Sequence, residues 1–230
     1  MTTTANLSTD ARVEAAPSWS GAMRLAGGVA LVAGPLLFSA GMFTSPPADS
    51  MADVDYISSL ARDLTMTQVS ALFLHYANVL IGLGILAAPS LVRGARGLRL
   101  VVAGSLATAL GFVNVSGMIL ADWWNAATGT LLDIDEAAAV FAHVKSASML
   151  GLWNGTELFS MLGPVLLLAG LARAGVLGWW TIALLLGGVA GLIALGSSLP
   201  ILAAVATLVG FSPFALVGMR LVQRHRLETR

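Results

Sequence analysis

Residues 147–172 read ASMLGLWNGTELFSMLGPVLLLAGLA, and Glu157 is the single charged side chain in this stretch. An apolar segment of about 20 residues can cross a bilayer, because an α-helix rises about 1.5 Å per residue and the hydrocarbon core is about 30 Å thick. A carboxyl group near the centre of a spanning helix costs about 2.5 to 3.5 kcal/mol, so such groups usually face a protein interior or a wet cavity. The stretch therefore predicts a membrane helix that carries a functional acid.

The composition of the whole chain is that of a membrane protein. Of its 230 residues, 57% are hydrophobic and 10% are charged, whereas soluble domains carry about 25% charged residues. The formal net charge is zero and gives no indication of a nucleic-acid partner. The absence of Cys excludes disulfides and thiolate metal sites. We therefore expect the lipid bilayer as the main partner and no nucleic acid, while the oligomeric state stays open.

Five further apolar stretches accompany the first, and together they predict an all-α, polytopic bundle of six transmembrane helices. The predicted spans are residues 25–43, 69–92, 98–121, 147–172, 176–199 and 201–222. Residues 1–24 are expected to form a disordered tail, and residues 223–230 a basic tail. Gly187 and Gly191 have the spacing that permits close helix approach.

The basic residues predict which side of the membrane each loop faces, because Lys and Arg in short loops are retained in the cytoplasm. In the six-span arrangement, only Arg62 and Lys145 fall on the outer side. The basic residues on the other side are Arg12, Arg24, Arg93, Arg96, Arg99, Arg173, Arg220, Arg224, Arg226 and Arg230. We therefore predict a multi-pass protein of the plasma membrane with both termini in the cytoplasm.

The two outer loops indicate a parallel internal duplication. The motif Asp-Val-Asp at residues 53–55 recurs 80 positions later as Asp-Ile-Asp at residues 133–135. Apolar residues follow each motif at helical spacing, which predicts two short amphipathic helices on the extracytoplasmic surface. Asp133 and Glu136 have the spacing of a capping box and are expected to start the second of these helices. The alternative is a divalent-ion site formed by Asp133, Asp135 and Glu136.

Polar side chains within the predicted spans are few and lie at similar depth. His75 and Asn78 are three residues apart, as are Asn154 and Glu157, so each pair shares one face of its helix. Asn114 belongs to the span between them. A structural interpretation is an interhelical hydrogen-bond cluster in which each bond contributes about 0.6 kcal/mol. The functional interpretation is a pocket in which Glu157 exchanges a proton with a substrate or with His75.

Other side chains are expected to complete such a pocket, since aromatic rings stabilise cations and a second acid, Asp122, ends the third span. The predicted catalytic residues are Glu157, Asp122 and His75. The predicted substrate-binding residues are Asn78, Asn114, Asn154, Trp153, Trp123 and Tyr76. No zinc, Walker or dinucleotide motif is present, so no cofactor is expected.

In length, multi-span topology and buried acids, roughly the whole chain resembles the small integral-membrane terpene cyclases of meroterpenoid and indole-terpenoid pathways. This resemblance implies an enzyme that binds a hydrophobic isoprenoid and cyclises it through an acid-initiated carbocation. The composition, rich in Ala, Gly, Leu and Arg with the single lysine Lys145, also resembles that of six-span membrane proteins from GC-rich actinobacteria. Two alternatives stay open: a small proton-linked transporter, and an accessory or scaffold protein whose polar cluster is structural.

Overall fold

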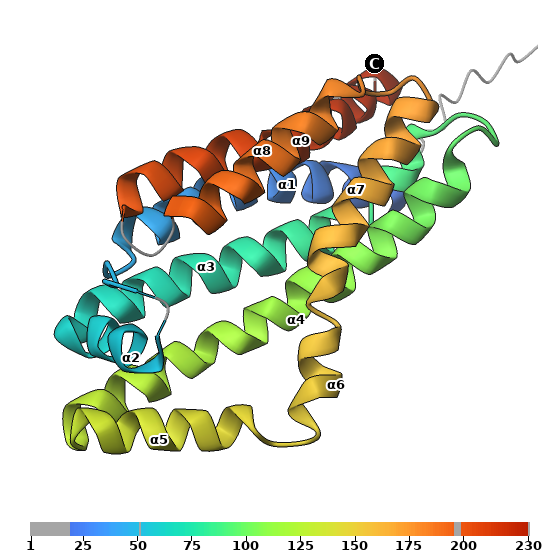
Figure 1. Cartoon of the computed structure of the whole chain (residues 1–230). Helices are drawn as coiled ribbons and strands as arrows, with labels where there is room; N and C mark the ends of the chain where they lie inside the picture. The colour runs from blue at the N-terminus through green and yellow to red at the C-terminus, as the bar shows by residue number, and fades with distance from the viewer. Residues whose placement is uncertain (1–18, 51, 196–198, 230) are drawn as a thin grey trace, which may run out of the picture.

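The computed structural model describes residues 19–50, 52–195 and 199–229. Most of the predicted N-terminal tail and residues 196–198 of the predicted fifth span lie outside these residues. The described chain is built from helices and turns and contains no strand (Figure 1). The all-α prediction is therefore confirmed.

Nine α-helices and one short 3-10 helix make up the described chain. They are α1 (Trp19–Thr44), α2 (Asp53–Arg62), α3 (Leu64–Ile85), η1 (Ala88–Leu91), α4 (Leu98–Leu131), α5 (Ile134–Lys145), α6 (Leu150–Gly155), α7 (Leu158–Arg173), α8 (Trp180–Leu195) and α9 (Pro200–Glu228). Five described segments are long and apolar enough to cross a bilayer. They comprise most of α1, then α3, α4, α6 with α7, and α9. The remaining apolar helix, α8, has 16 residues.

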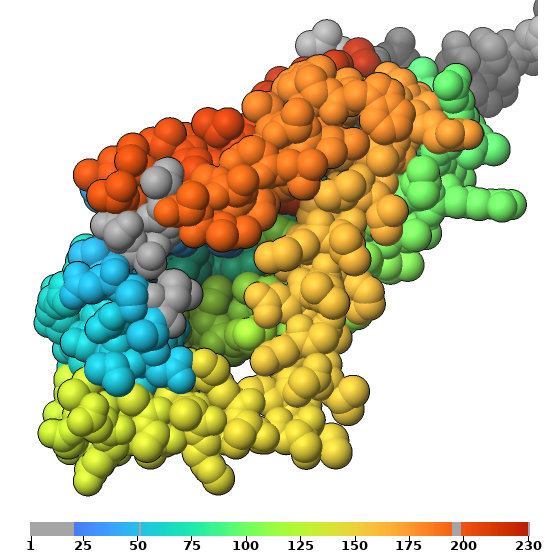
Figure 2. Space-filling view, in the orientation of Figure 1, coloured from blue at the N-terminus to red at the C-terminus, as the bar shows by residue number. Residues whose placement is uncertain are grey.

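The long helices pack side by side in the order α8, α9, α1, α3, α4 and α7 (Figure 1). The two outermost members, α7 and α8, are joined by a short loop and diverge from it. Figure 2 shows the surface hollowed between α8 and the α6–α7 segment, with atoms of α3 and α4 at the bottom of the hollow. The bundle is therefore open on this side.

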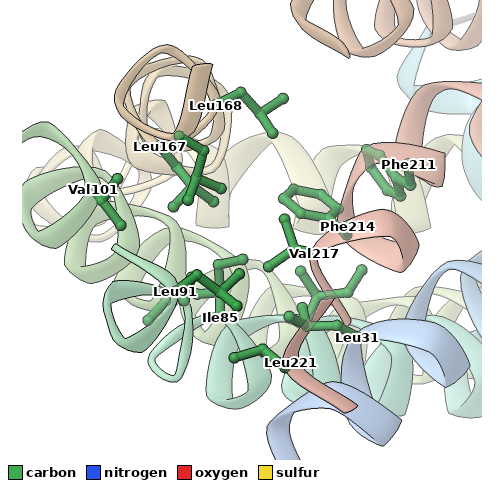
Figure 3. Close-up of a cluster of buried hydrophobic side chains, with 14 of the residues drawn as sticks. Leu31, Ile85, Leu91, Val101, Leu167, Leu168, Phe211, Phe214, Val217 and Leu221 are labelled. Carbon is green, nitrogen blue, oxygen red and sulfur yellow. The ribbon is translucent and has the colours of Figure 1, made fainter. Parts of the chain in front are cut away.

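A cluster of buried side chains joins all six long helices (Figure 3). Phe211 on α9 packs on rings from two other helices, with its ring 4.8 Å from that of Phe38 and 5.8 Å from that of Phe112, measured between centroids. Leu31 and Leu168 are fully buried in the same cluster. Lipid tails are as apolar as these side chains, so the cluster stabilises the bundle through close van der Waals packing.

Glycines set the closest helix approaches, although at different positions from those predicted. A Cβ added to Gly188 on α8 would lie 2.1 Å from the Cα of Gly210 on α9. A Cβ added to Gly191 would meet the Ala206 side chain at 2.9 Å, and one added to Gly187 would meet nothing within 4 Å. The predicted contact at Gly187 is therefore wrong, and its neighbour Gly188 makes the contact.

At one end of the bundle, α2, α5 and residues 122–131 of α4 form a small unit that we call the cap (Figure 1). Its core contains the buried residues Ile57 and Ala137, with Phe141 packed against them. Lys145 pairs with Asp53 across the cap, with 2.7 Å between Nζ and Oδ1. Both short amphipathic helices of the sequence prediction are thus present, and they pack on each other.

The opposite end, which we call the basic end, holds the start of α1, η1 and the end of α9. Glu228 accepts hydrogen bonds from both Arg24 and Arg224. Arg224 also donates to the Ser90 carbonyl oxygen of η1. These contacts tie three separate segments together, so the predicted tail from residue 223 continues α9 as far as Glu228.

Several predicted span limits are wrong. α4 continues ten residues past the predicted end at 121, because the cap packs against its extension. The predicted fourth span is broken at Thr156 and Glu157, which separate α6 from α7. α3 starts at Leu64 and ends at Ile85, α8 starts at Trp180, and α1 starts at Trp19. α1 packs on α3 and α4 on α7, with a short helix between the partners of each pair; the internal duplication itself stays a prediction.

Candidate ligand site between α3 and α4

His75 on α3 and Ser116 on α4 form a polar contact between two long helices. Nδ1 of His75 lies 2.8 Å from Oγ of Ser116 and 3.3 Å from its carbonyl oxygen. Ser116 is 2% exposed. Both contacts engage Nδ1, and among the described residues Nε2 of His75 has no hydrogen-bond partner. The serine therefore fixes the imidazole ring and leaves its second nitrogen free for a ligand.

The same two residues line a pocket of about 230 Å³ between α3 and α4. Its remaining walls are apolar or aromatic: Ala71, Leu72, Tyr76, Gly117, Ile119, Leu120 and Trp123. The imidazole of His75 is the only histidine, carboxylate or amine side chain in this lining. An apolar pocket with few polar groups is the usual form of a small-molecule site.

Trp153 extends the aromatic surroundings of this pocket. A Cβ added to Gly117 would lie 3.2 Å from Cζ2 of the Trp153 ring, so the ring covers this stretch of α4. Nδ2 of Asn114 donates to the Trp153 carbonyl oxygen at 3.0 Å and attaches α6 to α4. The three aromatic residues of the sequence prediction, Tyr76, Trp123 and Trp153, thus lie around one section of α4.

Glu157 does not join this group. It precedes the first residue of α7 and is half-buried at the break between α6 and α7. Among the described residues, its carboxylate has no hydrogen-bond or ion-pair partner, and no contact links it to His75. Asn154 is exposed, and Asn78 is buried and donates within α3 to the Leu74 carbonyl oxygen at 2.7 Å. The predicted five-residue cluster is therefore wrong: of its members, only His75 and Asn114 make interhelical side-chain bonds within the described chain.

Asp122 has a different partner from any that the sequence suggests. The phenol of Tyr56 on α2 donates a hydrogen bond to its carboxylate. Nδ2 of Asn125 is buried beside the same phenol without a hydrogen-bond partner of ordinary geometry. Burial raises the pKa of Tyr56 well above its ordinary value, and the neighbouring Asp122 carboxylate raises it further. This contact anchors α2 to α4 within the cap.

Tyr56 was missed because it lies 66 residues from its partner. One pattern does indicate it. Tyr56 precedes the apolar residues Ile57 and Leu60 on a short helix, and a contact with a charged residue of a neighbouring helix would hold such a helix in place. A carboxylate at a span end also requires a donor.

Asp133, the first acidic residue of the Asp-Ile-Asp motif, caps a helix. Oδ1 of Asp133 accepts from the backbone N–H of Asp135 at 3.0 Å and starts α5. In the described ranges, no three His, Cys, Asp or Glu side chains gather closely enough to hold a metal ion. The alternative of an ion site at Asp133, Asp135 and Glu136 has no support in this geometry, and the first carboxylate already has a structural role.

Comparison with protein families, curated proteins and solved structures finds no match to this chain.

Proposed function

We propose that this chain is an integral-membrane protein that binds a lipid-soluble small molecule in the pocket between α3 and α4, and that His75 exchanges a proton with it. The observation that carries the proposal is the combination of an apolar pocket with the imidazole of His75, whose Nδ1 is engaged by Ser116. Nε2 then remains for the ligand. A group positioned in this way is suited to general acid–base catalysis.

The reaction we propose for the pocket is cyclisation of a linear isoprenoid epoxide. The proton on Nε2 of the His75 imidazolium passes to the epoxide oxygen, and the C–O bond breaks as the π electrons of a neighbouring alkene form a C–C bond. The resulting carbocation loses a proton to neutral Nε2, which restores the imidazolium. The product is a cyclic alcohol that is an isomer of the substrate, so the reaction requires no oxidant and no cofactor.

The aromatic and apolar walls support this reaction. Tyr76 and Trp123 offer ring faces that stabilise a positive charge. Leu72, Ile119 and Leu120 exclude water, which would otherwise intercept the carbocation. His75 takes the proton role in this proposal in place of Glu157, which lies outside the pocket, and of Asp122, which Tyr56 engages.

The membrane topology is part of the same proposal. Five segments are suited to crossing a bilayer, and we propose α8 as a sixth span that crosses with a slight thinning of the lipid. Arg24 and Arg224 both lie at the basic end, whereas Arg62 and Lys145 lie at the cap end. This distribution supports cytoplasmic termini in a plasma membrane and an extracytoplasmic cap.

The test uses the purified chain in lipid nanodiscs with a linear farnesylated phenol that carries a terminal epoxide. Chromatography with mass spectrometry should detect a product of unchanged mass and shifted retention. His75→Gln removes the titrating group and should abolish the product, while the matched variant His143→Gln, at an exposed position of α5, should retain it. Glu157→Gln should also retain it.

Two results would overturn the proposal. One is unchanged turnover by His75→Gln at equal amounts of folded protein. The other is absence of product from the wild-type chain together with Glu157-dependent proton uptake into proteoliposomes, which would favour the transporter. If the wild-type chain is inactive and His75→Gln lowers only the thermal stability, the contact between His75 and Ser116 has a structural role.

A further inference from the structure

Three arginines converge on a second pocket, at the basic end of the bundle. Arg96 lies in the turn just before α4, Arg99 is in the first turn of α4, and Arg173 is the last residue of α7. Together with Ala95, Gly97 and Leu100 they line a space of about 680 Å³. Two helices distant in sequence therefore bring three positive charges to one place.

The charges in this pocket are not balanced within the described chain. Its ion pairs engage Arg24, Arg62, Lys145 and Arg224, and none reaches the three pocket arginines. Even the two basic residues at the cap end each have an aspartate partner. All three pocket arginines are exposed to the surroundings.

Arg99 also occupies a position that is unfavourable for an isolated helix. It lies in the first turn of α4, which contains no acidic residue and has no side-chain cap. The positive end of the helix dipole repels a cation placed there and attracts an anion. A bound anion would offset both the dipole and the guanidinium charges.

Gly97 explains how the two helix ends come together. Its φ of 79° is in the left-handed region, and an added Cβ would lie 2.3 Å from the Gly170 carbonyl oxygen of α7. Only glycine permits this approach. The backbone contact holds Arg173 beside the start of α4, so the pocket is built by the fold.

We infer that this pocket binds the phosphate group of an anionic ligand, with Arg96, Arg99 and Arg173 as its ligands. The arginine fork matches phosphate oxygens. Leu100 lies in the pocket at the first turn of a spanning helix, so the pocket is at the level of lipid headgroups. Basic pockets between spanning helices on this side of a membrane bind anionic headgroups. We therefore assign a phospholipid phosphate as the ligand, and the test also includes free phosphate.

The experiment titrates the full chain, in micelles of a zwitterionic detergent, with phosphatidylglycerol or with inorganic phosphate. Native mass spectrometry counts bound lipid, and thermal unfolding reports binding of either ligand. The triple variant Arg96→Gln, Arg99→Gln and Arg173→Gln should bind about 100-fold more weakly. The matched control Arg93→Gln, an exposed arginine outside the pocket, should bind as the wild type does.

Retention of lipid by the wild type and by the control, with loss in the triple variant, supports the site. Equal stabilisation by inorganic phosphate, also lost in the triple variant, supports the same phosphate site with a water-soluble ligand as its source. Equal binding by the wild type and the triple variant would overturn the inference, and so would equal loss in the triple variant and in Arg93→Gln.

Discussion

The phenol of Tyr56 on α2 donates to the carboxylate of Asp122 on α4, and this hydrogen bond holds α2 against the longest helix of the described chain. The Tyr56 ring also packs on Phe141 of α5, with 5.7 Å between ring centroids. One side chain therefore connects all three parts of the cap.

Tyr56→Phe should destabilise the cap. The variant keeps the ring contact with Phe141 but leaves the Asp122 carboxylate without its donor, and an unsatisfied buried polar group costs about 1 to 3 kcal/mol. Unfolding in mild detergent, followed by circular dichroism, measures the loss. Tyr76→Phe is the matched control, because Tyr76 is 55% exposed and has no hydrogen bond among the described residues. Equal stability of Tyr56→Phe and wild type would show that the hydrogen bond is not formed.

The ionisation of Tyr56 should require unusually alkaline conditions. Burial and the Asp122 carboxylate raise the pKa of this phenol above its ordinary value of 10.0. Because the pKa is higher in the folded than in the unfolded state, the neutral phenol stabilises the fold below pH 10 and stability falls as the pH rises further. In the Tyr76→Phe background Tyr56 is the only tyrosine, so its phenolate absorbance reports the titration directly. Ionisation at the ordinary pH would contradict the buried contact.

Gly188→Ala should destabilise the pair of helices α8 and α9. The new methyl group would overlap the backbone of Gly210, and overpacking of this kind costs about 1 to 3 kcal/mol. Gly187→Ala, one residue away with nothing within 4 Å, should be neutral or slightly stabilising, since alanine favours helix. Thermal unfolding of the two variants side by side makes the comparison. The same loss in both would place the helix contact elsewhere.

Glu157→Gln should change stability by less than about 0.5 kcal/mol. The carboxylate is half-buried, and among the described residues it bonds to nothing that a neutral amide would lose. The same thermal unfolding assay measures the difference. A large destabilisation would instead support the interhelical cluster that the sequence alone predicts.

The fold class and most of the helices could be predicted from the sequence, because hydrophobic length is a direct consequence of bilayer thickness. Hydropathy could not predict that α4 continues past Asp122. In residues 122–131, Gly129 packs closely against Ile57 on α2, and this contact stabilises the extended helix. Hydropathy also does not predict the break at Thr156, because the run around it is mostly apolar. The residue before the break, Gly155, is a weak helix former.

The candidate site was predictable in its residue types and not in its pairings. Spacing along one helix places His75 and Asn78 on the same face, yet only His75 bonds to α4 while Asn78 bonds within its own helix. Which face meets which neighbour depends on helix rotation and packing order, and one sequence does not determine these. Ser116, the partner of His75, is a common residue in spans and had no distinguishing feature.

The length of α4 has a mechanical consequence. Its 34 residues form a continuous helix of about 51 Å. The arginine pocket lies at its first turn, and its last three turns belong to the cap. Because no break interrupts this helix, a change in the tilt of the end that carries the cap also changes the tilt of the end beside the arginine pocket.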